Sequence, residues 1–472
     1  SIKLLNMMTT KTTLTYILLL LYISILSSCE DFVEVAPPND RLVSQSVFDN
    51  ETSARSAMQG IYNQLMIVYY SNGGENSVTN LAGLSADNLE TIRPTNPTYL
   101  EFQKKEILPD NSRNLELWSG AYNIIYLANS LLEGISRTNL NEDLINELEA
   151  QGKFIRAFSY FYLVNLYGEV PLLLSTDYTT NAIAGRDPVD EVYMQIVDDL
   201  QQAIPLLNDD YIDGERTTII RSAAEALLAR VQLYRGNWNQ AAELSTKVIS
   251  NHQIFSLLED LNQVFLLNSK EAIWQISPLG RGNGSTQTEE GALYVINPNQ
   301  PGIYNLQLTA DFVTTFSQGD QRAESWIGYF EDNNVYYPHK YKDGFSTNNL
   351  TEYSMVLRLA EQYLIRAEAR ARLGQYNLAV EDINVIKQRA GIELLDPNQQ
   401  WSEEDLLEII IEEKRKEFFT EWGHRWLDLK RLHLATNILA THSSEWQPTD
   451  VLYPIPEEER MSNINLSQNE GY

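Results

Sequence analysis

The chain has few of the side chains that form disulfide or metal cross-links. Of its 472 residues only Cys29 is a cysteine, and only 5 are histidines. A single thiol cannot form a disulfide within the chain, so packing must stabilise the fold even in an oxidising compartment. His424, His433 and His442 follow one another at intervals of nine, which turns successive side chains to opposite sides of a helix. We therefore predict no metal site and no cofactor.

Motifs of catalysis are also missing. The sequence has no G-x-S-x-G nucleophile, no phosphate-binding loop and no zinc-ligand spacing. A glycosidase would need two carboxylates held across a sugar. The sequence has 64 acidic residues, and its pattern selects no particular pair of them. We predict that the protein is not an enzyme, with a surface glycosidase as the least favoured alternative.

Positive charge is scarce. With 35 lysines and arginines against 64 acidic residues, the formal net charge is -29. Nucleic acids and anionic lipid surfaces are recognised through basic patches. The composition therefore excludes nucleic acid as a partner and excludes charge-driven binding to a membrane.

Long apolar runs are absent except for one near the start, residues 14–26. A transmembrane helix needs about 20 apolar residues, so this run is too short to span a bilayer. Lys3 and Lys11 precede it, and the small residues Ser27 and Ser28 follow it. This order is typical of a secretory signal peptide.

The sequence at the end of this run, Leu26-Ser27-Ser28-Cys29, resembles a bacterial lipobox. In a lipobox the cysteine sulfur takes a diacylglycerol and the cysteine becomes the new N-terminus. We predict a signal peptide at 1–28, a lipidated tether at 29–46 that begins at Cys29, and one folded body at 47–472. The membrane would then be contacted through the lipid anchor only.

Most of the body shows the periodicity of amphipathic helices. Helices are predicted at 48–66, 115–132, 144–167, 188–207, 217–235, 238–250, 353–373, 376–389 and 403–432. A helical scaffold would therefore lie mainly in 47–68, 115–250 and 353–432. Residues 69–112 and 262–345 are rich in Gly, Asn, Pro and aromatics, and predict a loop-rich lobe with short strands at 272–276 and 292–296. Ser402 and Asp405 form a capping box before the last helix.

One internal repeat is visible in the sequence. Residues 234–242 align with residues 372–380: in each, a helix ends at a glycine, an aromatic residue begins the next helix, and an alanine follows three residues later. This pattern is typical of a tetratricopeptide-like helix hairpin, in which small residues let two helices approach closely. The predicted fold is mainly α, with such hairpins scattered among other structure.

Six segments carry a resemblance to a known family. They include YGEVP at 167–171, GHRWLDLKR at 423–431 and YPIP at 453–456, within the segments 152–171, 192–200, 223–236, 357–374, 412–431 and 453–472. Together and in this order they resemble the SusD/RagB family of nutrient-binding lipoproteins over almost the whole chain after Cys29. Glu470 stands where that family usually has proline.

This resemblance implies a SusD-like helical scaffold on the outer membrane, at the cell surface, of a Bacteroidetes-type bacterium. It also implies a partner, a TonB-dependent SusC-like barrel, to which the protein would deliver an oligosaccharide or polysaccharide, or in some members a peptide. Glu30 and Asp31 resemble the surface-export signal of such bacteria. The alternative that the residues leave open is a tetratricopeptide-type adaptor that binds only proteins or peptides.

Sugar recognition needs flat aromatic faces surrounded by amides and hydroxyls. Rings on irregular loops can offer such faces, whereas rings on amphipathic helices are normally buried. This rule selects ligand-binding candidates in the two loop-rich segments: Tyr69, Tyr70, Tyr99, Phe102, Trp326, Tyr329 and Tyr336, with Phe330 and Tyr337 beside them. Asn76, Asn88 and Asn96 are the polar neighbours expected. Trp118, Trp238, Trp422 and Trp426 lie in helical patterns and are assigned to the core.

Two groups of charged residues receive structural interpretations. The mixed charges at 412–417 have the spacing of ion pairs on an exposed helix surface. Arg358 and Glu361, three residues apart beside an apolar stripe, are predicted to form a partly buried pair with each other.

Overall fold

The structure is a computed structural model that describes residues 45–92, 96–297 and 306–472. Residues Gln45–Tyr472 form one compact unit. The predicted signal peptide, Cys29 and most of the predicted tether lie outside the described residues. Within the described ranges, no helix is long and apolar enough to cross a membrane.

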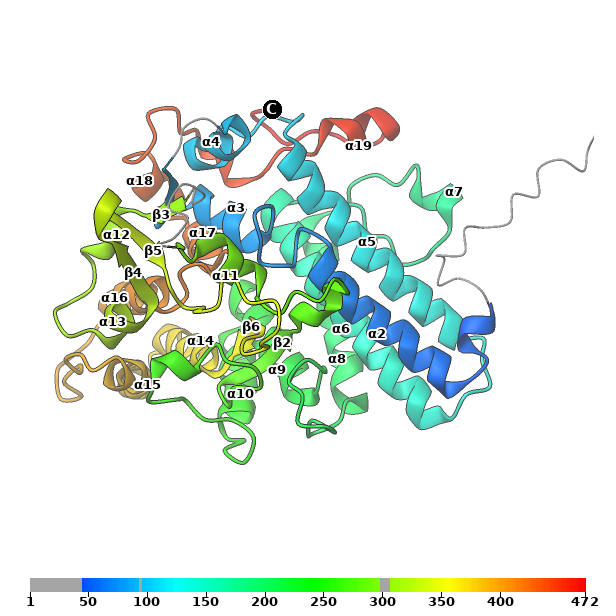
Figure 1. Ribbon diagram of the computed structural model, residues 1–472, viewed down its shortest axis with the longest axis horizontal. Coiled ribbons are helices and arrows are strands. Elements are labelled where there is room, and N and C mark those ends of the chain that lie inside the picture. Colours follow the sequence, from blue (N-terminus) through cyan, green and yellow to red (C-terminus); the bar gives the residue numbers. More distant parts are fainter. Residues whose placement is uncertain (1–44, 93–95, 298–305) are drawn as a thin grey trace, which may run out of the picture. The chain divides into compact units, whose positions relative to one another are not determined.

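Helices make up most of this unit (Figure 1). The α-helices are α2 (Glu51–Ile67), α3 (Val78–Ser85), α4 (Pro97–Lys104), α5 (Ser112–Ile135), α6 (Glu142–Tyr167), α7 (Tyr178–Asn181), α8 (Val189–Ala203), α9 (Arg221–Tyr234), α10 (Trp238–Ile249), α11 (Glu289–Tyr294), α12 (Ala310–Val313), α13 (Gln321–Trp326), α14 (Leu359–Arg372), α15 (Tyr376–Arg389), α16 (Glu403–Glu417), α17 (His424–Arg431), α18 (Ala435–Leu439) and α19 (Glu457–Ser462). Short 3₁₀ helices are η1 (Gln45–Phe48), η2 (Ile204–Leu206), η3 (Leu261–Gln263), η4 (Pro278–Arg281), η5 (Glu331–Asn333) and η6 (Pro448–Val451).

The strands in the described residues form antiparallel pairs. They are β1 (Leu89–Thr91) with β3 (Leu306–Leu308), β2 (Ala272–Ile276) with β6 (Ser354–Arg358), and β4 (Ile327–Phe330) with β5 (Val335–Pro338). The last pair is a hairpin in which Tyr329 lies opposite Tyr336. The fold is therefore mainly α with a few short strands, as the sequence predicted.

Helix α6 is the centre of the core. It packs between α5 and α8, and α2 lies against α5 (Figure 1). Its aromatic side chains Phe154 and Phe158 meet Trp274 of β2 edge to face, with ring centroids 5.1 Å apart in both cases. Trp422 closes the same cluster, 5.0 Å from Phe158. Because aromatic pairs gain energy beyond the area they bury, this cluster fixes β2 against the helical scaffold.

The predicted repeat corresponds to two helix hairpins. α9 with α10 forms the first and α14 with α15 forms the second, and α10 packs against α14. One core cluster combines small residues of both hairpins: Ala229, Leu233, Ala241, Ile365 and Ala369. The hairpins are distant in sequence but adjacent in space, because the small residues allow the helices to approach closely.

Three local predictions were wrong. Residues 354–358 form strand β6 rather than the start of a helix, because they pair with β2. The helix predicted at 403–432 is interrupted at 418–423, where Thr420 and Trp422 have φ values of 52° and 44° that no helix accepts. Residues 292–296, predicted as a strand, belong largely to α11. The capping box of Ser402 and Asp405 is confirmed.

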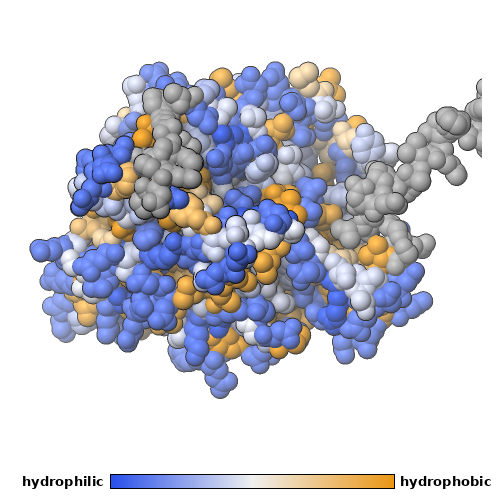
Figure 2. Space-filling view, in the orientation of Figure 1, coloured by the Kyte–Doolittle hydropathy of each residue, from blue (hydrophilic) through white to orange (hydrophobic). Residues whose placement is uncertain are grey.

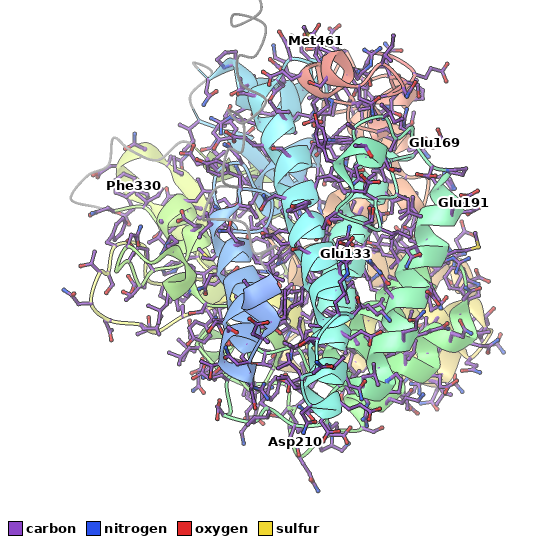
Figure 3. The ribbon with its side chains drawn as sticks, turned by 90° about the vertical axis from the view of Figure 1, so that its right-hand side faces the viewer. Glu133, Glu169, Glu191, Asp210, Phe330 and Met461 are labelled. Carbon is purple, nitrogen blue, oxygen red and sulfur yellow. The ribbon has the colours of Figure 1, made fainter. Side chains whose placement is uncertain are left out.

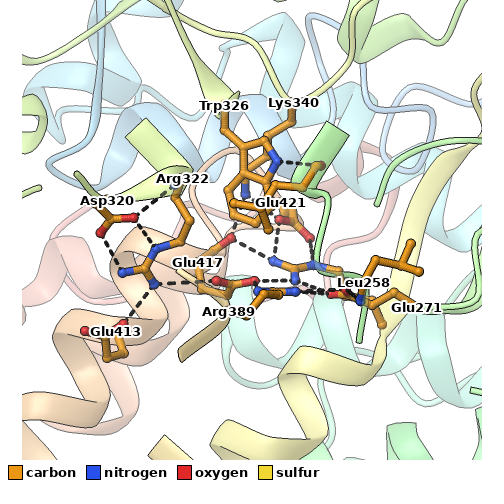
Figure 4. A network of polar contacts seen from close by, with 12 residues as sticks. Leu258, Glu271, Asp320, Arg322, Trp326, Lys340, Arg389, Glu413, Glu417 and Glu421 are labelled. Carbon is orange, nitrogen blue, oxygen red and sulfur yellow. Dashed lines mark hydrogen bonds and ion pairs between the residues drawn. The ribbon is translucent and has the colours of Figure 1, made fainter. Parts of the chain in front are cut away.

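A buried network of ion pairs, here called the Arg358 network, joins the strands to α15 and α16 (Figure 4). Arg358 contacts Glu421 at 2.8 Å, Glu417 at 2.6 Å and Glu271 at 3.0 Å. The other members are Asp320, Arg322, Lys340, Arg389 and Glu413. All of these side chains are at most 5% exposed.

The structure corrects one interpretation of charged residues and part of the other. Glu412 and Arg415 do pair along α16, at 3.8 Å. Glu413, Lys414 and Glu417, however, are buried and pair with distant elements. Arg358 and Glu361 do not pair with each other, since Glu361 binds Arg230 of α9 at 2.5 Å. A spacing of three or four residues shows that two charges could meet on a helix, but it does not show which of them face the core.

Candidate functional site

The seven aromatic candidates differ sharply in exposure. Four are at most 1% exposed: Tyr70, Tyr99, Phe102 and Trp326. The other three present much of their surface to solvent: Tyr69 at 49%, Tyr329 at 47% and Tyr336 at 36%. Only these three offer a ring face to a ligand in this structure.

The expectation that loop rings face solvent was wrong for the buried rings between residues 69 and 112. That segment is not one irregular loop, because it contains α3, β1 and α4. Tyr70 packs beside Gly120 of α5, and its hydroxyl lies 2.8 Å from that of Ser159. Phe102 of α4 meets Tyr453 edge to face at 5.4 Å. Tyr99 and Phe102 are thus buried because they lie on α4, which sequence periodicity missed, whereas Tyr70 is buried against the predicted helices α5 and α6.

Trp326 is a structural part of the Arg358 network (Figure 4). Its indole nitrogen donates a hydrogen bond to the backbone oxygen of Leu261 at 3.1 Å, and the Lys340 ammonium lies 4.8 Å from its ring centroid. The ring is fully buried. Trp326 therefore stabilises the network and is not available for stacking on a sugar.

Tyr69 lies in a groove of about 530 Å³, here called the Tyr69 groove. The groove is formed by the C-terminal end of α2, the loop that follows it, η4 and the start of α11. It is lined by Met66, Ile67, Tyr69, Asn72, Gly74, Glu75, Asn76, Arg281, Asn283 and Glu289. In Figure 2 the surface over this loop and η4, near the centre of the view, mixes pale and blue residues with small orange patches. Its volume lies within the range usual for small-molecule sites.

Neighbouring backbone and side-chain groups hold the amides of the groove in place. Asn72 accepts a hydrogen bond from the backbone N–H of Gly74 at 2.9 Å. Asn76 donates to Glu116 of α5 and accepts from Arg113. Because both ends of the Asn76 amide are bound, its orientation is fixed.

Tyr99 supports this arrangement from below the surface. The Arg113 guanidinium lies 3.8 Å from the centroid of the Tyr99 ring, a stacked cation–π geometry. Arg113 also lies 3.6 Å from the Glu75 carboxylate. Tyr99 thus positions Arg113, and Arg113 positions Asn76.

The opposite wall of the groove carries a second ion pair. Arg281 of η4 pairs with Glu289, the first residue of α11, and also donates to the backbone oxygen of Gln287. Asn283 accepts a hydrogen bond from the backbone N–H of Ser285 at 3.0 Å. These contacts hold a glycine-rich turn against α11.

A buried carboxyl group lies under the groove loop. Gly73 has φ of 82°, and a Cβ at this position would lie 2.1 Å from the Glu290 carboxyl carbon. Only glycine allows the loop to cross Glu290 so closely. Ser354 donates to Glu290 at 2.5 Å, and burial raises the pKa of Glu290 to about 7.

The chemistry of the groove suits a neutral polar ligand. It offers one half-exposed aromatic face, oriented amides, and carboxylates that are already paired with arginine. Sugars are bound by stacking of their apolar face on such a ring and by hydrogen bonds to such amides. Among the described residues, no three His, Cys, Asp or Glu side chains are placed to hold a metal ion.

Tyr329 and Tyr336 lie elsewhere. Their rings face each other across the β4–β5 hairpin, with centroids 4.8 Å apart. Figure 1 places this hairpin away from α2, and Figure 3 shows Phe330 at the edge of the molecule. Tyr337 is half-buried beside Tyr336. The three exposed candidates therefore do not form one binding surface. A ligand-binding role for Tyr329 and Tyr336 stays a prediction.

Of the predicted polar neighbours, only Asn76 lines the groove. Asn88 is buried and accepts a hydrogen bond from Arg415 at 2.8 Å, while Asn96 is the N-cap residue before α4. Sequence reasoning missed Asn72, Arg281, Asn283 and Glu289. The close spacing of Gly280, Gly282 and Gly284 was a local signal that the chain turns there, but nothing local indicated that this turn meets α2.

Comparisons with known proteins agree with the fold. Residues 31–233 match a family described as "Starch-binding associating with outer membrane", and residues 321–472 match the SusD family. A SusD-like protein of Formosa agariphila is 31% identical over 415 residues, which cover 77% of this chain and 81% of that protein. The chain belongs to the SusD/RagB family.

Solved structures show the same fold. A SusD superfamily protein from Bacteroides vulgatus aligns over 90% of this chain and 99% of its own with a TM-score of 0.80 and 21% identity. A structure titled "Laminarin binding SusD-like protein" aligns over 90% of this chain and 100% of its own, with a TM-score of 0.77 and 24% identity. The family of this chain includes glycan-binding proteins, and the chain has the same fold as these proteins.

Proposed function

We propose that the protein binds an oligosaccharide or polysaccharide at the cell surface through the Tyr69 groove, without cleaving it. The observation that carries this proposal is the half-exposed Tyr69 ring beside amides whose orientation is fixed by neighbouring backbone and side-chain groups. Family membership supports it, because a related structure is described as laminarin binding. Glu75 and Glu289 pair with Arg113 and Arg281, which favours binding over hydrolysis.

The binding site is tested by titrating the intact chain with a panel of neutral polysaccharides, including starch and laminarin, in a detergent without a sugar headgroup. Tyr69→Ala should weaken binding at least tenfold, because stacking of the sugar on the ring is lost while the exposed ring contributes little to stability. Tyr363→Ala, a half-buried tyrosine on α14, is the matched control and should leave affinity unchanged.

Two results would contradict the proposal. If no glycan binds, a peptide ligand and the tetratricopeptide-type adaptor become the better explanation. If new reducing ends appear during incubation, the protein is a glycosidase. Loss of binding in Tyr363→Ala as well would show that the effect of Tyr69→Ala is not specific to the groove.

The sequence adds a proposal about location and delivery. Residues 1–28 would be a signal peptide, 29–46 a tether lipidated at Cys29, and 47–472 the binding body, on the outer surface of the outer membrane. The body would pass its ligand to a TonB-dependent SusC-like barrel, as the family resemblance implies.

Cys29→Ala separates anchoring from binding. The variant should lose retention in the outer-membrane fraction and lose uptake, while the folded body keeps its glycan affinity within twofold. Cell fractionation and titration measure the two effects. Ser27→Ala, which keeps a small residue before the cysteine, is the control and should remain anchored. Copurification of a large outer-membrane barrel with the wild-type chain, but not with Cys29→Ala, would support delivery.

A further inference from the structure

A second cleft lies beside α5, α7 and α19. Its volume is about 390 Å³. It is lined by Trp118, Ser119, Tyr122, Ile125, Tyr126 and Asn129 of α5, by residues of the 171–182 segment that include Tyr178 and Asn181, and by Glu459, Ser462, Asn463 and Leu466. Figure 3 looks onto this side of the molecule, with α5 running down the middle and Met461 at its upper end.

Aromatic rings form two sides of this cleft. Tyr122 and Tyr126 are half-buried and lie one turn apart on the same face of α5. Trp118 holds Tyr122 from behind, with ring centroids 5.0 Å apart, and is itself held by Tyr167 at 5.0 Å. Tyr178, which is 80% exposed, lines the cleft from α7. Rings from two separate elements therefore border one space.

The walls of the cleft are fixed by side-chain amides. Asn129 donates to the backbone oxygen of Leu173 at 2.9 Å, and Asn181 donates to that of Ser175 at 2.8 Å. Asn463 donates to the backbone oxygen of Ala184 at 2.8 Å and so ties the end of α19 to the α7 segment. These bonds fix the walls of the cleft relative to one another.

Several hydroxyl groups remain available in the cleft. Within the parts of the chain that the structure describes, no protein group forms a hydrogen bond with the side-chain hydroxyls of Ser119, Tyr126 or Ser462. Glu459 is the only charged side chain among the described lining residues, and burial raises the pKa of its carboxyl group, with Glu458 acting in the same direction. The cleft therefore favours a neutral ligand with many hydroxyl groups.

The cleft is separate from the Tyr69 groove. Glu116, which binds Asn76 of the groove, and Tyr122 are six residues apart on α5, so their side chains point about 120° apart around the helix. The two sites thus lie on different sides of α5. A short ligand in one would not contact the other.

We propose that this cleft is a second carbohydrate subsite, which holds one or two neutral pyranose rings between Tyr178 and the Tyr122–Tyr126 face of α5. This inference rests on the proposed function, because it assigns a second site for the same class of ligand. Two subsites on one chain raise the avidity for a long polysaccharide, since the second contact is intramolecular. Three apolar side chains outside the cleft are exposed and would also suit a protein partner: Ile183, Met461 and Ile464. The experiment distinguishes a protein partner from a carbohydrate ligand.

The test uses neutral trisaccharides, which are too short to span both sites: maltotriose, laminaritriose, xylotriose and mannotriose. Saturation-transfer NMR is recorded on the intact chain in a detergent without a sugar headgroup. The variants are Tyr69→Ala, Tyr178→Ala, the double variant that combines them, and Tyr126→Phe in the Tyr69→Ala background. Tyr363→Ala is the control.

For the trisaccharide that binds, each single alanine variant should keep a transfer signal of roughly half the wild-type size, and the double variant should lose it. Tyr126→Phe made in the Tyr69→Ala background should weaken the remaining binding severalfold, because it keeps the ring and removes the hydroxyl. Tyr178 is exposed, so its replacement leaves folding intact.

The inference fails alone if Tyr69→Ala abolishes the signal, or if Tyr178→Ala has no effect in either background; an apolar protein partner would then be the better occupant. If Tyr178→Ala abolishes the signal and Tyr69→Ala does not reduce it, the cleft is a subsite and the groove assignment fails. If no trisaccharide and no polysaccharide binds, the inference and the proposed function fail together.

Discussion

The Tyr69 groove and the Arg358 network are both built from arginines, carboxylates and aromatic rings, yet they differ in access to solvent. In the groove, Tyr69 is 49% exposed and the Glu75 side chain is 57% exposed. In the network, Glu417 and Glu271 are fully buried. The groove leaves one ring face and several amides for a ligand, whereas every charge of the network is used within the protein.

The difference shows what burial does to the same chemical groups. Burial alone would raise the pKa of Glu417, but Arg389, Arg358 and Arg322 hold it well below its usual range. The Lys340 pKa falls to about 8 because burial outweighs its pairing with Glu421. A buried charge is tolerated only when its partners are fixed, so the network is rigid and structural.

Removing the central arginine should have the largest effect. Arg358→Met leaves Glu271, Glu417 and Glu421 buried with fewer partners, and should lower the free energy of unfolding by about 3–5 kcal/mol. Urea unfolding of the intact chain measures it. Arg55→Met, on the exposed face of α2, is the matched control and should cost at most about 1 kcal/mol. Equal losses in the two variants would show that the network is not held as tightly as the distances suggest.

The next effect depends on pH. The folded-state pKa of Glu290, about 7, lies above its ordinary value of 4.5. Stability is therefore unaffected by its ionisation below pH 4.5 and falls as pH rises through about 7. Glu290→Gln cannot ionise, so its stability relative to wild type should increase by about 1–3 kcal/mol between pH 4 and pH 8. A difference between the two chains that stays constant over this range would contradict the burial of an unpaired carboxyl group.

A smaller effect is expected for Arg113, which holds Asn76 of the Tyr69 groove in place. Arg113→Met keeps a side chain over the Tyr99 ring but cannot bind Asn76, and should weaken glycan binding by about 1–2 kcal/mol, or roughly tenfold. Asn76→Ala should have a similar effect, and the double variant should be no worse than either single one because both act on one contact. Fully additive losses would mean that Arg113 acts on the ligand by another route.

The smallest effect is expected at the β4–β5 hairpin. Tyr329→Ala removes an exposed cross-strand contact with Tyr336, and should cost about 0.2–1 kcal/mol of stability. It should leave glycan affinity at the groove unchanged, which the same titration measures. A tenfold loss of affinity would place the hairpin in the ligand site after all and would remove the contrast between exposed rings that bind and exposed rings that only pack.

Sequence periodicity predicted the long helices well. α2, α5, α6 and α15 begin and end within a few residues of their predicted bounds, because each carries several turns of apolar residues and a clear end signal. The failures are short or overridden elements. α3 and α4 have 8 residues each, too few for a reliable period, and β6 exists because β2 lies beside it.

The candidate site was predicted only in part. The loop rule found Tyr69 and Asn76, but it also selected Trp326, whose ring is enclosed by side chains that are distant in the sequence. It missed Arg281 and Asn283, which reach the groove because η4 packs on α2. Exposure of a single ring depends on which elements cover it, and no local pattern contains that information.

The sequence by itself determined the helical class of the fold, the two related hairpins and the absence of a disulfide within the chain, because these follow from periodicity, repeated spacing and composition. The family was indicated by the resemblance of six segments to known members. Only the tertiary structure decided which aromatic rings remain open and which carboxylates are buried. Both properties depend on contacts between segments such as α2 with η4, or α16 with β6. Such contacts are set by packing across the whole chain rather than by neighbours in sequence.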